Sequence, residues 1–258
     1  MNDETHQEFK NKVCLITGGA GSIGLATALK VFNAGGKVAL IDHNLENLEK
    51  AKTEFNDLNR LLVLQADVSN SQDTKDYISQ TIAKWGKIDI LFSNAGFSGT
   101  SAPITDYPED VFDKVMAINV RGSFLACKYA LPKINNGGNI LITSSIMGVT
   151  ARPGSIAYIT SKHALIGLMR GISKEAAPRN VRVNVLAPGP VDNTFQLEIE
   201  ERASKASGTN VTEMLNNWIA LGRHATPEEI ANMAYFLMSD KSSFSTGGVF
   251  MADGGMHV

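Results

Sequence analysis

The sequence predicts an α/β fold, in which helices cover both faces of one doubly wound parallel sheet of about seven strands. Three observations carry this prediction. Short apolar runs without polar alternation recur along the 258 residues, longer amphipathic segments separate them, and a glycine-rich turn follows the first run. Strands buried on both faces have this composition because helices cover each side of the sheet. The repeated alternation argues against reading every run as buried helix.

Each apolar run is short and rich in Val, Ile and Leu, which is typical of a buried strand. The expected strands are residues 13–17, 37–42, 61–67, 88–94, 139–145, 181–187 and 248–252. The amphipathic segments between them suit helices at residues 22–34, 45–55, 71–85, 108–131, 156–177 and 227–238. The last helix has the clearest start, because Thr226 precedes Pro227 and Glu229 can complete a capping box.

Composition and charge are those of an ordinary globular protein. Hydrophobic residues make up 43% and charged residues 19%, which fits neither a disordered nor a fibrous chain. The formal net charge of −2 excludes a strong general attraction to nucleic acid or to an anionic membrane. No apolar run approaches the roughly 18 residues that a membrane-spanning helix needs. We therefore expect neither a nucleic-acid nor a membrane partner.

The cysteines and the N-terminal residues give information on the cellular location of the protein. Cys14 and Cys127 each lie in an apolar stretch, so neither a disulfide framework nor a cysteine zinc cluster is expected. The five histidines show no ligand spacing, and no metal site is expected. Residues 1–6 are polar and acidic, unlike a signal peptide. These features together predict a cytoplasmic protein.

No linker or internal repeat divides the chain, so residues 1–258 are expected to form a single domain. One stretch breaks the rhythm of strands and helices. Residues 190–217 are polar, charged and rich in small side chains, and they are longer than an ordinary connection. They form either a lid over a site or a surface excursion, and we expect the lid.

A glycine-rich turn, Thr17-Gly18-Gly19-Ala20-Gly21-Ser22-Ile23-Gly24, joins the first expected strand to the first expected helix. Glycines there let the backbone approach a pyrophosphate, which the helix N-terminus attracts. A methyltransferase can share this geometry, so the turn alone does not decide the chemistry. Asp42 ends the second expected strand, where a carboxylate can bond both adenosine ribose hydroxyls and repel a 2′-phosphate. With His43 next and no arginine at 42–44, we expect NAD rather than NADP.

Tyr158 and Lys162 lie four residues apart in an expected helix, so they share one face. Ser145 ends an expected strand at the carboxyl edge of the sheet, where open α/β sheets bind ligands. Hydride transfer at a carbon that bears oxygen requires a proton to move at that oxygen. A free tyrosine has a pKa of about 10, which a cationic lysine and an oxidised nicotinamide would lower. We expect Ser145 to orient the substrate oxygen while Tyr158 exchanges its proton.

Taken in order, these motifs resemble the classical short-chain dehydrogenase/reductase family over nearly the whole chain. The matching stretches are Thr17–Gly24, Asp67-Val68, Ser93-Asn94-Ala95-Gly96, Asn119, Ser144-Ser145, Tyr158–Lys162, Pro188-Gly189 and Asp253-Gly254-Gly255. The resemblance implies a Rossmann fold and a catalytic tetrad of Asn119, Ser145, Tyr158 and Lys162. It casts Tyr158 as the acid/base and Lys162 as the group that holds the nicotinamide ribose and lowers the tyrosine pKa. Asn119 is implied to position a water that leads protons to solvent.

The resemblance also implies the cofactor contacts, with Asp67 and Val68 flanking adenine. The other implied contacts are Gly18, Gly21, Ser22, Ile23, Gly24, Asp42, His43, Asn94, Ala95, Gly96, Tyr158, Lys162, Pro188, Gly189, Val191 and Thr194. The chain departs from the family pattern at Ser22, usually glycine, at Ser93, usually asparagine, and at Asn193, usually threonine. The nicotinamide carboxamide contact is therefore expected from the Val191 backbone with Asn193 or Thr194.

Substrate contacts and assembly are implied in the same way. By family position, Ser145, Met147, Phe195 and Leu197 would border the substrate. The 190–217 segment offers no clear cationic clamp for a carboxylate, so we expect a small or medium, largely uncharged substrate. The helix that carries Tyr158 has a stripe of small residues, which the family buries between subunits, and this implies a homotetramer.

The sequence thus predicts an NAD(H)-dependent oxidoreductase that interconverts a secondary alcohol and a ketone. A 3-oxoacyl-carrier-protein reductase remains the near alternative, although such an enzyme usually uses NADPH, which Asp42 disfavours. A non-catalytic dinucleotide sensor is the alternative from another class, and it would have no need of Tyr158 and Lys162 together.

Overall fold

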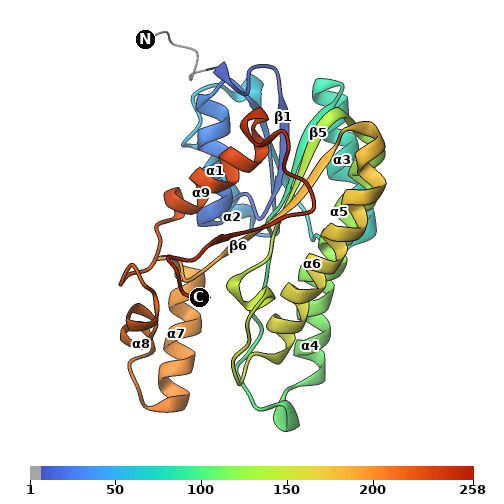
Figure 1. Ribbon diagram of the computed structural model, residues 1–258. Helices are drawn as coiled ribbons and strands as arrows, with labels where there is room; N and C mark the ends of the chain where they lie inside the picture. Colours follow the sequence, from blue (N-terminus) through green and yellow to red (C-terminus); the bar gives the residue numbers. More distant parts are fainter. Residues whose placement is uncertain (1–6) are drawn as a thin grey trace.

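The computed structural model describes residues 7–258, except for the side chains of residues 206 and 207. Residues 1–6, on which the expectation about the N-terminus rests, lie outside the described residues. Within the described part, seven parallel strands form one sheet in the order β3-β2-β1-β4-β5-β6-β7 (Figure 1). This order confirms the expected doubly wound α/β sheet, in which the winding changes direction between β1 and β4.

Helices cover both faces of this sheet. The strands are β1 (Val13–Thr17), β2 (Lys37–Asp42), β3 (Leu61–Gln65), β4 (Ile88–Ser93), β5 (Ile134–Thr143), β6 (Arg182–Pro188) and β7 (Val249–Ala252). The helices are α1 (Ser22–Asn33), α2 (Leu45–Lys52), α3 (Ser71–Trp85), α4 (Glu109–Val115), α5 (Gly122–Ala130), α6 (Ile156–Ala176), α7 (Thr194–Ser207), α8 (Val211–Trp218) and α9 (Pro227–Met238). Figure 1 shows α1, α2 and α9 on one face, and α3, α5 and α6 on the other.

The side chains of β1 alternate between the two hydrophobic cores. Cys14 and Ile16 pack with α1, α2 and α9, whereas Leu15 packs with α3, α5 and α6. Every residue of β1 is buried, which explains why the strand reads as a continuous apolar run. Both cysteines are free thiols, Cys14 in one core and Cys127 in the other. Within residues 7–258, no helix combines the length and the apolar character that crossing a membrane requires.

One expected helix is interrupted. Residues 108–131 were expected to form a single helix, but α4 ends at Val115 and α5 begins only at Gly122. A π-helical turn covers Met116–Arg121 between them. Such turns add a residue to the helical repeat, and they re-aim the side chains that they contain. The expected strand 61–67 is also shorter, because Asp67 closes a turn with Ser69 after β3.

The segment 190–217 is largely helical. Two asparagines in this polar segment act as helix N-caps. The side chain of Asn193 accepts a hydrogen bond from the Gln196 N–H at 2.8 Å, and that of Asn210 accepts one from the Glu213 N–H at 3.2 Å. These caps begin α7 and α8, which lie beyond the carboxyl edge of the sheet and opposite α4 (Figure 1). The capping box expected at Thr226 is present at the start of α9.

Candidate active site

The glycine-rich turn between β1 and α1 is packed too tightly for side chains. A Cβ atom on Gly24 would lie 2.2 Å from the carbonyl oxygen of Gly18, and one on Gly18, whose φ is +63°, would lie 2.9 Å from Ala95 Cα. The N-cap of α1 is Gly21, which has no side chain to bond the first helical N–H groups, whereas Asn44 caps α2 with its side chain. The N-terminus of α1 therefore keeps free N–H groups, which suit a pyrophosphate.

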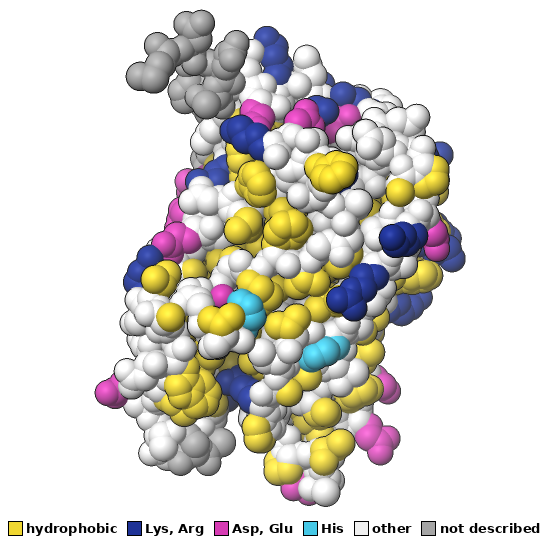
Figure 2. All heavy atoms as spheres, in the orientation of Figure 1, with side chains coloured by type: hydrophobic (Ala, Val, Ile, Leu, Met, Phe, Trp, Pro, Cys, Tyr) yellow, Lys and Arg dark blue, Asp and Glu magenta, His cyan; other side chains and the backbone are white. Residues whose placement is uncertain are grey.

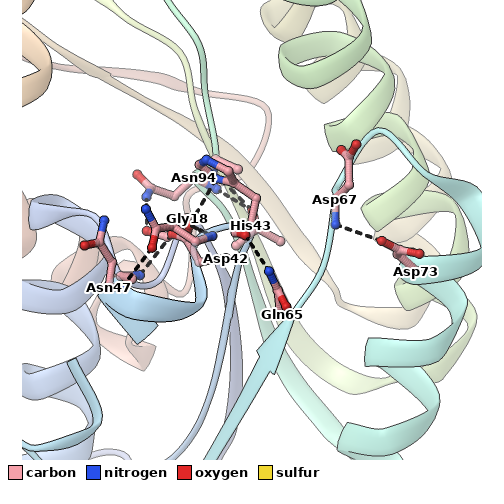
Figure 3. Close-up of polar contacts among 12 residues, drawn as sticks. Gly18, Asp42, His43, Asn47, Gln65, Asp67, Asp73 and Asn94 are labelled. Carbon is pink, nitrogen blue, oxygen red and sulfur yellow. Dashed lines mark hydrogen bonds and ion pairs between the residues drawn. The ribbon is translucent and has the colours of Figure 1, made fainter. Parts of the chain in front are cut away.

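Asp42 fixes the carboxyl end of β2 against this turn (Figure 3). Its Oδ2 accepts a hydrogen bond from the Ala20 N–H at 3.2 Å, and its Oδ1 accepts one from the Asn44 N–H at 3.1 Å. The exposed His43 ring brings Nδ1 within 3.2 Å of Oδ1, and only 11% of the Asp42 side chain is exposed. The residues present thus hold a carboxylate where the ribose of a bound adenosine belongs in this type of sheet.

Asn94 joins the carboxyl ends of β1, β4 and β5. Its Nδ2 donates to the Gly18 carbonyl at 3.3 Å, and its Oδ1 accepts from the Thr143 hydroxyl at 3.0 Å (Figure 3). The backbone N–H groups of Asn94 and Ala95 both donate to the Thr17 hydroxyl oxygen, at 3.0 and 3.2 Å. Thr17 and Thr143 thereby hold the expected cofactor edge in place, and sequence reasoning assigned them no such role.

Asp67 and Val68 lie apart from this group. Figure 3 shows Asp67 beside Asp73, away from Asp42 and Gly18, and the Asp67 N–H donates to Asp73 Oδ2 at 2.9 Å. The Asp67 carboxylate accepts hydrogen bonds from both the N–H and the hydroxyl of Ser69. Val68 is buried next to Gly122 of α5. Their contact with adenine stays a prediction.

Asn119 lies within the π-helical turn and is fully buried. Its Oδ1 accepts from the Phe97 N–H at 2.7 Å, and its Nδ2 donates to the Phe97 carbonyl at 3.0 Å and to the Ser161 hydroxyl at 2.9 Å. Asn119 thus fastens the loop after β4 to α6. A Cβ on Gly96 of that loop would lie 3.6 Å from both Asn119 Oδ1 and Lys162 Nζ, so the loop backbone borders both side chains.

Ser145, Tyr158 and Lys162 meet at the carboxyl edge of the sheet. The Lys162 amine is buried, donates to the Thr143 carbonyl at 2.9 Å and lies 5.4 Å from the centre of the Tyr158 ring. Ser145 interacts with the Tyr158 phenol and lowers its pKa, and the Ser145 Oγ accepts a hydrogen bond from the Met147 N–H at 3.1 Å. The structure therefore brings together the three groups that the sequence spacing had associated with proton transfer.

Burial dominates the electrostatics of this cluster. It raises the pKa of Tyr158 to about 12, against smaller lowering effects from the Ser145 hydrogen bond and the positive charge of Arg152. Burial also lowers the pKa of Lys162 to about 8. Arg152 therefore adds a positive charge that sequence analysis did not consider, and the lowering effect expected from Lys162 stays a prediction. The phenol is protonated at neutral pH and can donate to a substrate oxygen.

Known proteins resemble this chain over almost its full length. A family profile described as enoyl-(acyl carrier protein) reductase matches residues 18–257. The 3-oxoacyl-[acyl-carrier-protein] reductase FabG of Thermotoga maritima is 34% identical over 253 residues, which cover 97% of this chain and 99% of that protein. The chain belongs to the short-chain dehydrogenase/reductase family. Levodione reductase of Leifsonia aquatica, another relative, is 31% identical over 255 residues, covering 96% of this chain and 94% of that protein.

Solved structures of other short-chain dehydrogenases/reductases have the same fold. The crystal structure of levodione reductase gives a TM-score of 0.92 at 30% identity, covering 96% of this chain and 98% of the other. The structure of NAD+-bound xylitol dehydrogenase gives 0.88 at 34% identity, covering 95% and 98%. These likenesses confirm the Rossmann fold. The protein is therefore an oxidoreductase of a family that binds a nicotinamide dinucleotide.

The loop after β6 faces the glycine-rich turn in this short-chain dehydrogenase/reductase. Pro188 ends β6, and Gly189 follows where a Cβ would lie 2.8 Å from Asp253 Cα. Val191 is buried and forms an isolated parallel bridge with Ala225. The backbone of this loop is therefore fixed on both sides before α7 begins.

Two departures from the family pattern contact each other. Asn193 Nδ2 donates to the Ser22 hydroxyl at 2.9 Å, while the side-chain Oδ1 of Asn193 caps α7 by accepting from the Gln196 N–H. Thr194, the first residue of α7, is exposed. Neither residue is shown in contact with a nicotinamide, so the choice between Asn193 and Thr194 for the carboxamide stays a prediction.

The residues expected to border the substrate are accessible to different degrees. Met147 is partly buried next to Ser145, whereas the Phe195 and Leu197 side chains on α7 are 38% and 53% exposed. Leu197 also lines a hollow of the α7–α8 region together with Glu200 and Thr212. Membership of the substrate pocket stays a prediction for all three. Arg152, whose charge acts on Tyr158, was missed, because none of the motifs that sequence analysis used includes it.

Proposed function

We propose that this short-chain dehydrogenase/reductase is an NAD(H)-dependent enzyme that interconverts a secondary alcohol and a ketone, with Tyr158 as the acid/base. The observation that carries the proposal is the cluster at the carboxyl edge of the sheet. There the Tyr158 phenol interacts with Ser145, and its ring lies 5.4 Å from the buried Lys162 amine, next to the loop that borders the glycine-rich turn. A nicotinamide, when bound, supplies or accepts the hydride.

Each residue of the tetrad has a defined task in this proposal. Ser145 holds the substrate oxygen by a hydrogen bond, and Tyr158 gives a proton to that oxygen during reduction or takes one during oxidation. A phenol with a pKa of about 12 is a competent acid, and its use as a base requires further positive charge close by. Lys162 carries such a charge on the same helix face. Asn119 fixes the loop after β4 against α6 and so keeps the wall of the site in place.

The preference for NAD rests on Asp42. Its carboxylate is tied to the backbone at Ala20 and Asn44, so it has a fixed position at the end of β2. A fixed negative charge there accepts hydrogen bonds from ribose hydroxyls and repels a 2′-phosphate. The remaining contacts proposed for the dinucleotide follow the glycine-rich turn, the Asn94-Ala95-Gly96 loop and the loop after β6.

A second candidate function is that of a 3-oxoacyl-carrier-protein reductase. The 34% identity to such an enzyme of Thermotoga maritima favours it. Asp42 opposes the NADPH that such an enzyme usually uses, and this is why we rank it second. A non-catalytic dinucleotide sensor ranks last, because binding alone gives no use for the Tyr158 and Lys162 pair.

Assembly, lid and location belong to the same proposal. We expect residues 1–258 to act as one domain in which α7 and α8, within segment 190–217, cover the substrate. The homotetramer expected from the family is tested by light scattering at micromolar concentration, where a monodisperse monomer would overturn it. The two buried thiols fit a cytoplasmic location, where cysteines stay reduced.

The function is tested with a panel of secondary alcohols, ketones and a 3-oxoacyl thioester, each assayed with both cofactors. We expect NADH formation or consumption with some alcohol and ketone pairs and much weaker activity with NADP(H). Turnover of the thioester alone, with NADPH, would favour the second candidate. Dinucleotide binding without turnover of any compound would favour the sensor.

A further inference from the structure

Arg152 lies in the loop that connects Ser145 to Tyr158, at the carboxyl edge of the sheet. Its side chain is only partly exposed, and its Nε is buried without a hydrogen-bond partner among the residues that the structure describes. Figure 2 shows a groove between the part of the molecule formed by α7 and α8 and the part formed by α4 and α6, with basic surface visible inside it. A buried hydrogen-bond donor without a partner lowers the stability of the folded protein, and a ligand that accepts a bond from this nitrogen would remove that penalty.

The Arg152 guanidinium lies close enough to Tyr158 and to Glu200 of α7 for its charge to interact with both. Its charge acts on the Tyr158 phenol, and both Tyr158 and Glu200 of α7 act on it in return. Burial lowers the pKa of Arg152, while Tyr158 and Glu200 raise it, but a guanidinium stays positively charged in proteins regardless. A positive charge therefore acts on the Tyr158 hydroxyl.

Glu200 does not satisfy this arginine. Its Oε1 accepts hydrogen bonds from Gln196 at 2.7 Å and from His224 at 2.6 Å, and its Oε2 accepts one from the Thr212 hydroxyl. Burial raises the pKa of Glu200, but the hydrogen bonds from Thr212, Gln196 and His224 bring it below its ordinary value. The carboxylate is thus ionised and already bonded within the α7–α8 region.

Two other arginines of this chain have a structural role, and their guanidinium groups donate hydrogen bonds to other residues of the chain. Arg182 is buried and donates to the carbonyls of Leu237, Ser239 and Ser242. Arg202, which belongs to α7, donates to the Ser98 hydroxyl at 3.0 Å. Arg152 differs because its buried donor is left free at the place where a substrate would enter. That difference separates a binding role from a structural one.

We propose that Arg152 binds a carboxylate of the substrate, so that this enzyme acts on a hydroxy acid or the corresponding oxo acid. The inference rests on the proposed alcohol and ketone chemistry, and it replaces the expectation of an uncharged substrate, which considered cations of the 190–217 segment alone. A guanidinium pairs with a planar carboxylate through two parallel hydrogen bonds. The nearby negative charge of Glu200 favours a singly charged carboxylate over a doubly charged phosphate.

The carboxylate takes no part in the bond changes. It orients the carbinol or carbonyl carbon with respect to Tyr158, and the hydride and the proton move at that carbon and its oxygen. A substrate without the carboxylate keeps the reacting atoms but loses the anchor. The ratio of kcat/KM for an acid to kcat/KM for its neutral ester therefore measures the contribution of Arg152 to carboxylate binding.

The test compares Arg152→Gln and Arg152→Lys with the wild type, using 2-oxo, 3-oxo and 4-oxo acids and their methyl esters as matched pairs. We expect kcat/KM for the preferred acid to fall by about tenfold or more in Arg152→Gln, with the ester changing by less than about threefold. Arg152→Lys keeps the charge without the planar fork and should fall between the two. Arg170→Gln, an exposed position on the same helix as Tyr158, is the matched control and should change neither.

A binding measurement keeps the inference separate from the proposed function. Calorimetric titration of the NADH-loaded protein with butanoate, which cannot be reduced, should give a signal that Arg152→Gln removes and Arg170→Gln retains. Equal losses for acid and ester, or butanoate binding that survives Arg152→Gln, would overturn the role of Arg152. Turnover of esters without preference for acids would overturn this inference alone, whereas a lack of turnover for every compound would overturn the proposed function.

Discussion

The side chain of Asn193 donates a hydrogen bond to the Ser22 hydroxyl at 2.9 Å, although 171 positions separate the two residues in the sequence. The bond joins the N-cap of α7 to the first residue of α1. It therefore connects the segment proposed as a lid to the turn proposed to hold the dinucleotide phosphates. Ser22 and Asn193 are both departures from the family pattern, and their contact gives a physical reason for their occurring together.

Removing this bond should loosen α7. Ser22→Ala deletes the acceptor but leaves Asn193 capping α7 through the Gln196 N–H. We expect amide hydrogen exchange across Thr194–Ser207 to accelerate by about two- to tenfold, because a neutral hydrogen bond contributes about 0.5–1.5 kcal/mol. Asn193→Ala should accelerate it further, since the cap is lost as well. Exchange in Ser22→Ala at the wild-type rate would show that the bond does not hold α7.

Thr17 should matter for stability more than its small side chain implies. Its buried hydroxyl oxygen accepts both the Asn94 and the Ala95 N–H groups. Thr17→Val leaves two donors without a partner, and we expect the free energy of unfolding in urea to fall by about 2–4 kcal/mol. Thr17→Ser retains the oxygen and serves as the control. Equal losses in both variants would point to the methyl group instead.

Tyr158→Phe tests the proposed acid/base directly. We expect kcat to fall by about 10²–10⁴-fold, because the substrate oxygen loses its proton donor. The dissociation constant of NADH, measured by fluorescence titration, should stay within about threefold of the wild type. Tyr129→Phe, which removes a hydroxyl bonded to Ser71, is the control and should keep its activity. A Tyr158→Phe enzyme with normal turnover would rule out the mechanism.

Asp42→Ala should relax the preference between the two cofactors. Loss of the carboxylate removes the repulsion of a 2′-phosphate and the bonds to the ribose, so the NADP:NAD ratio of kcat/KM should rise by about tenfold or more. The ratio is measured with one substrate and both cofactors. Asp76→Ala, which removes a carboxylate bonded to Gln72 on α3, controls for the change in net charge. An unaltered ratio in Asp42→Ala would remove Asp42 from cofactor selection.

Lys162 should make stability depend on pH. Burial holds its pKa at about 8 in the folded chain, below its value in the unfolded chain. The unfolded state therefore binds more protons between these two values, and stability rises with pH across that range. Relative to Lys162→Met, the wild type should gain up to about 3 kcal/mol in free energy of unfolding between pH of about 7 and about 10. A difference that stays constant with pH would contradict a buried amine with a lowered pKa.

The order of apolar runs and amphipathic segments was enough to predict the doubly wound sheet. Buried parallel strands need apolar side chains on both faces, and short segments such as Val13–Thr17 show this as an uninterrupted apolar run. The positions of Ser145, Tyr158 and Lys162 followed in the same way, because strand ends and helical spacing set where side chains can meet. The helices of segment 190–217 were not predicted, because their asparagine caps lie among polar residues that also suit a loop.

By itself, the sequence determined the fold, the glycine-rich turn and the residues that meet at the carboxyl edge, since each depends on local pattern and on the rules of parallel sheets. Only the tertiary structure decided that a π-helical turn buries Asn119, that Ser22 and Asn193 bond each other, and that the charge of Arg152 acts on Tyr158 while its Nε has no partner among the described residues. These are contacts between segments far apart in the chain or side chains aimed by an irregular loop. No periodic pattern encodes them, because they arise when packing fixes the distances between elements.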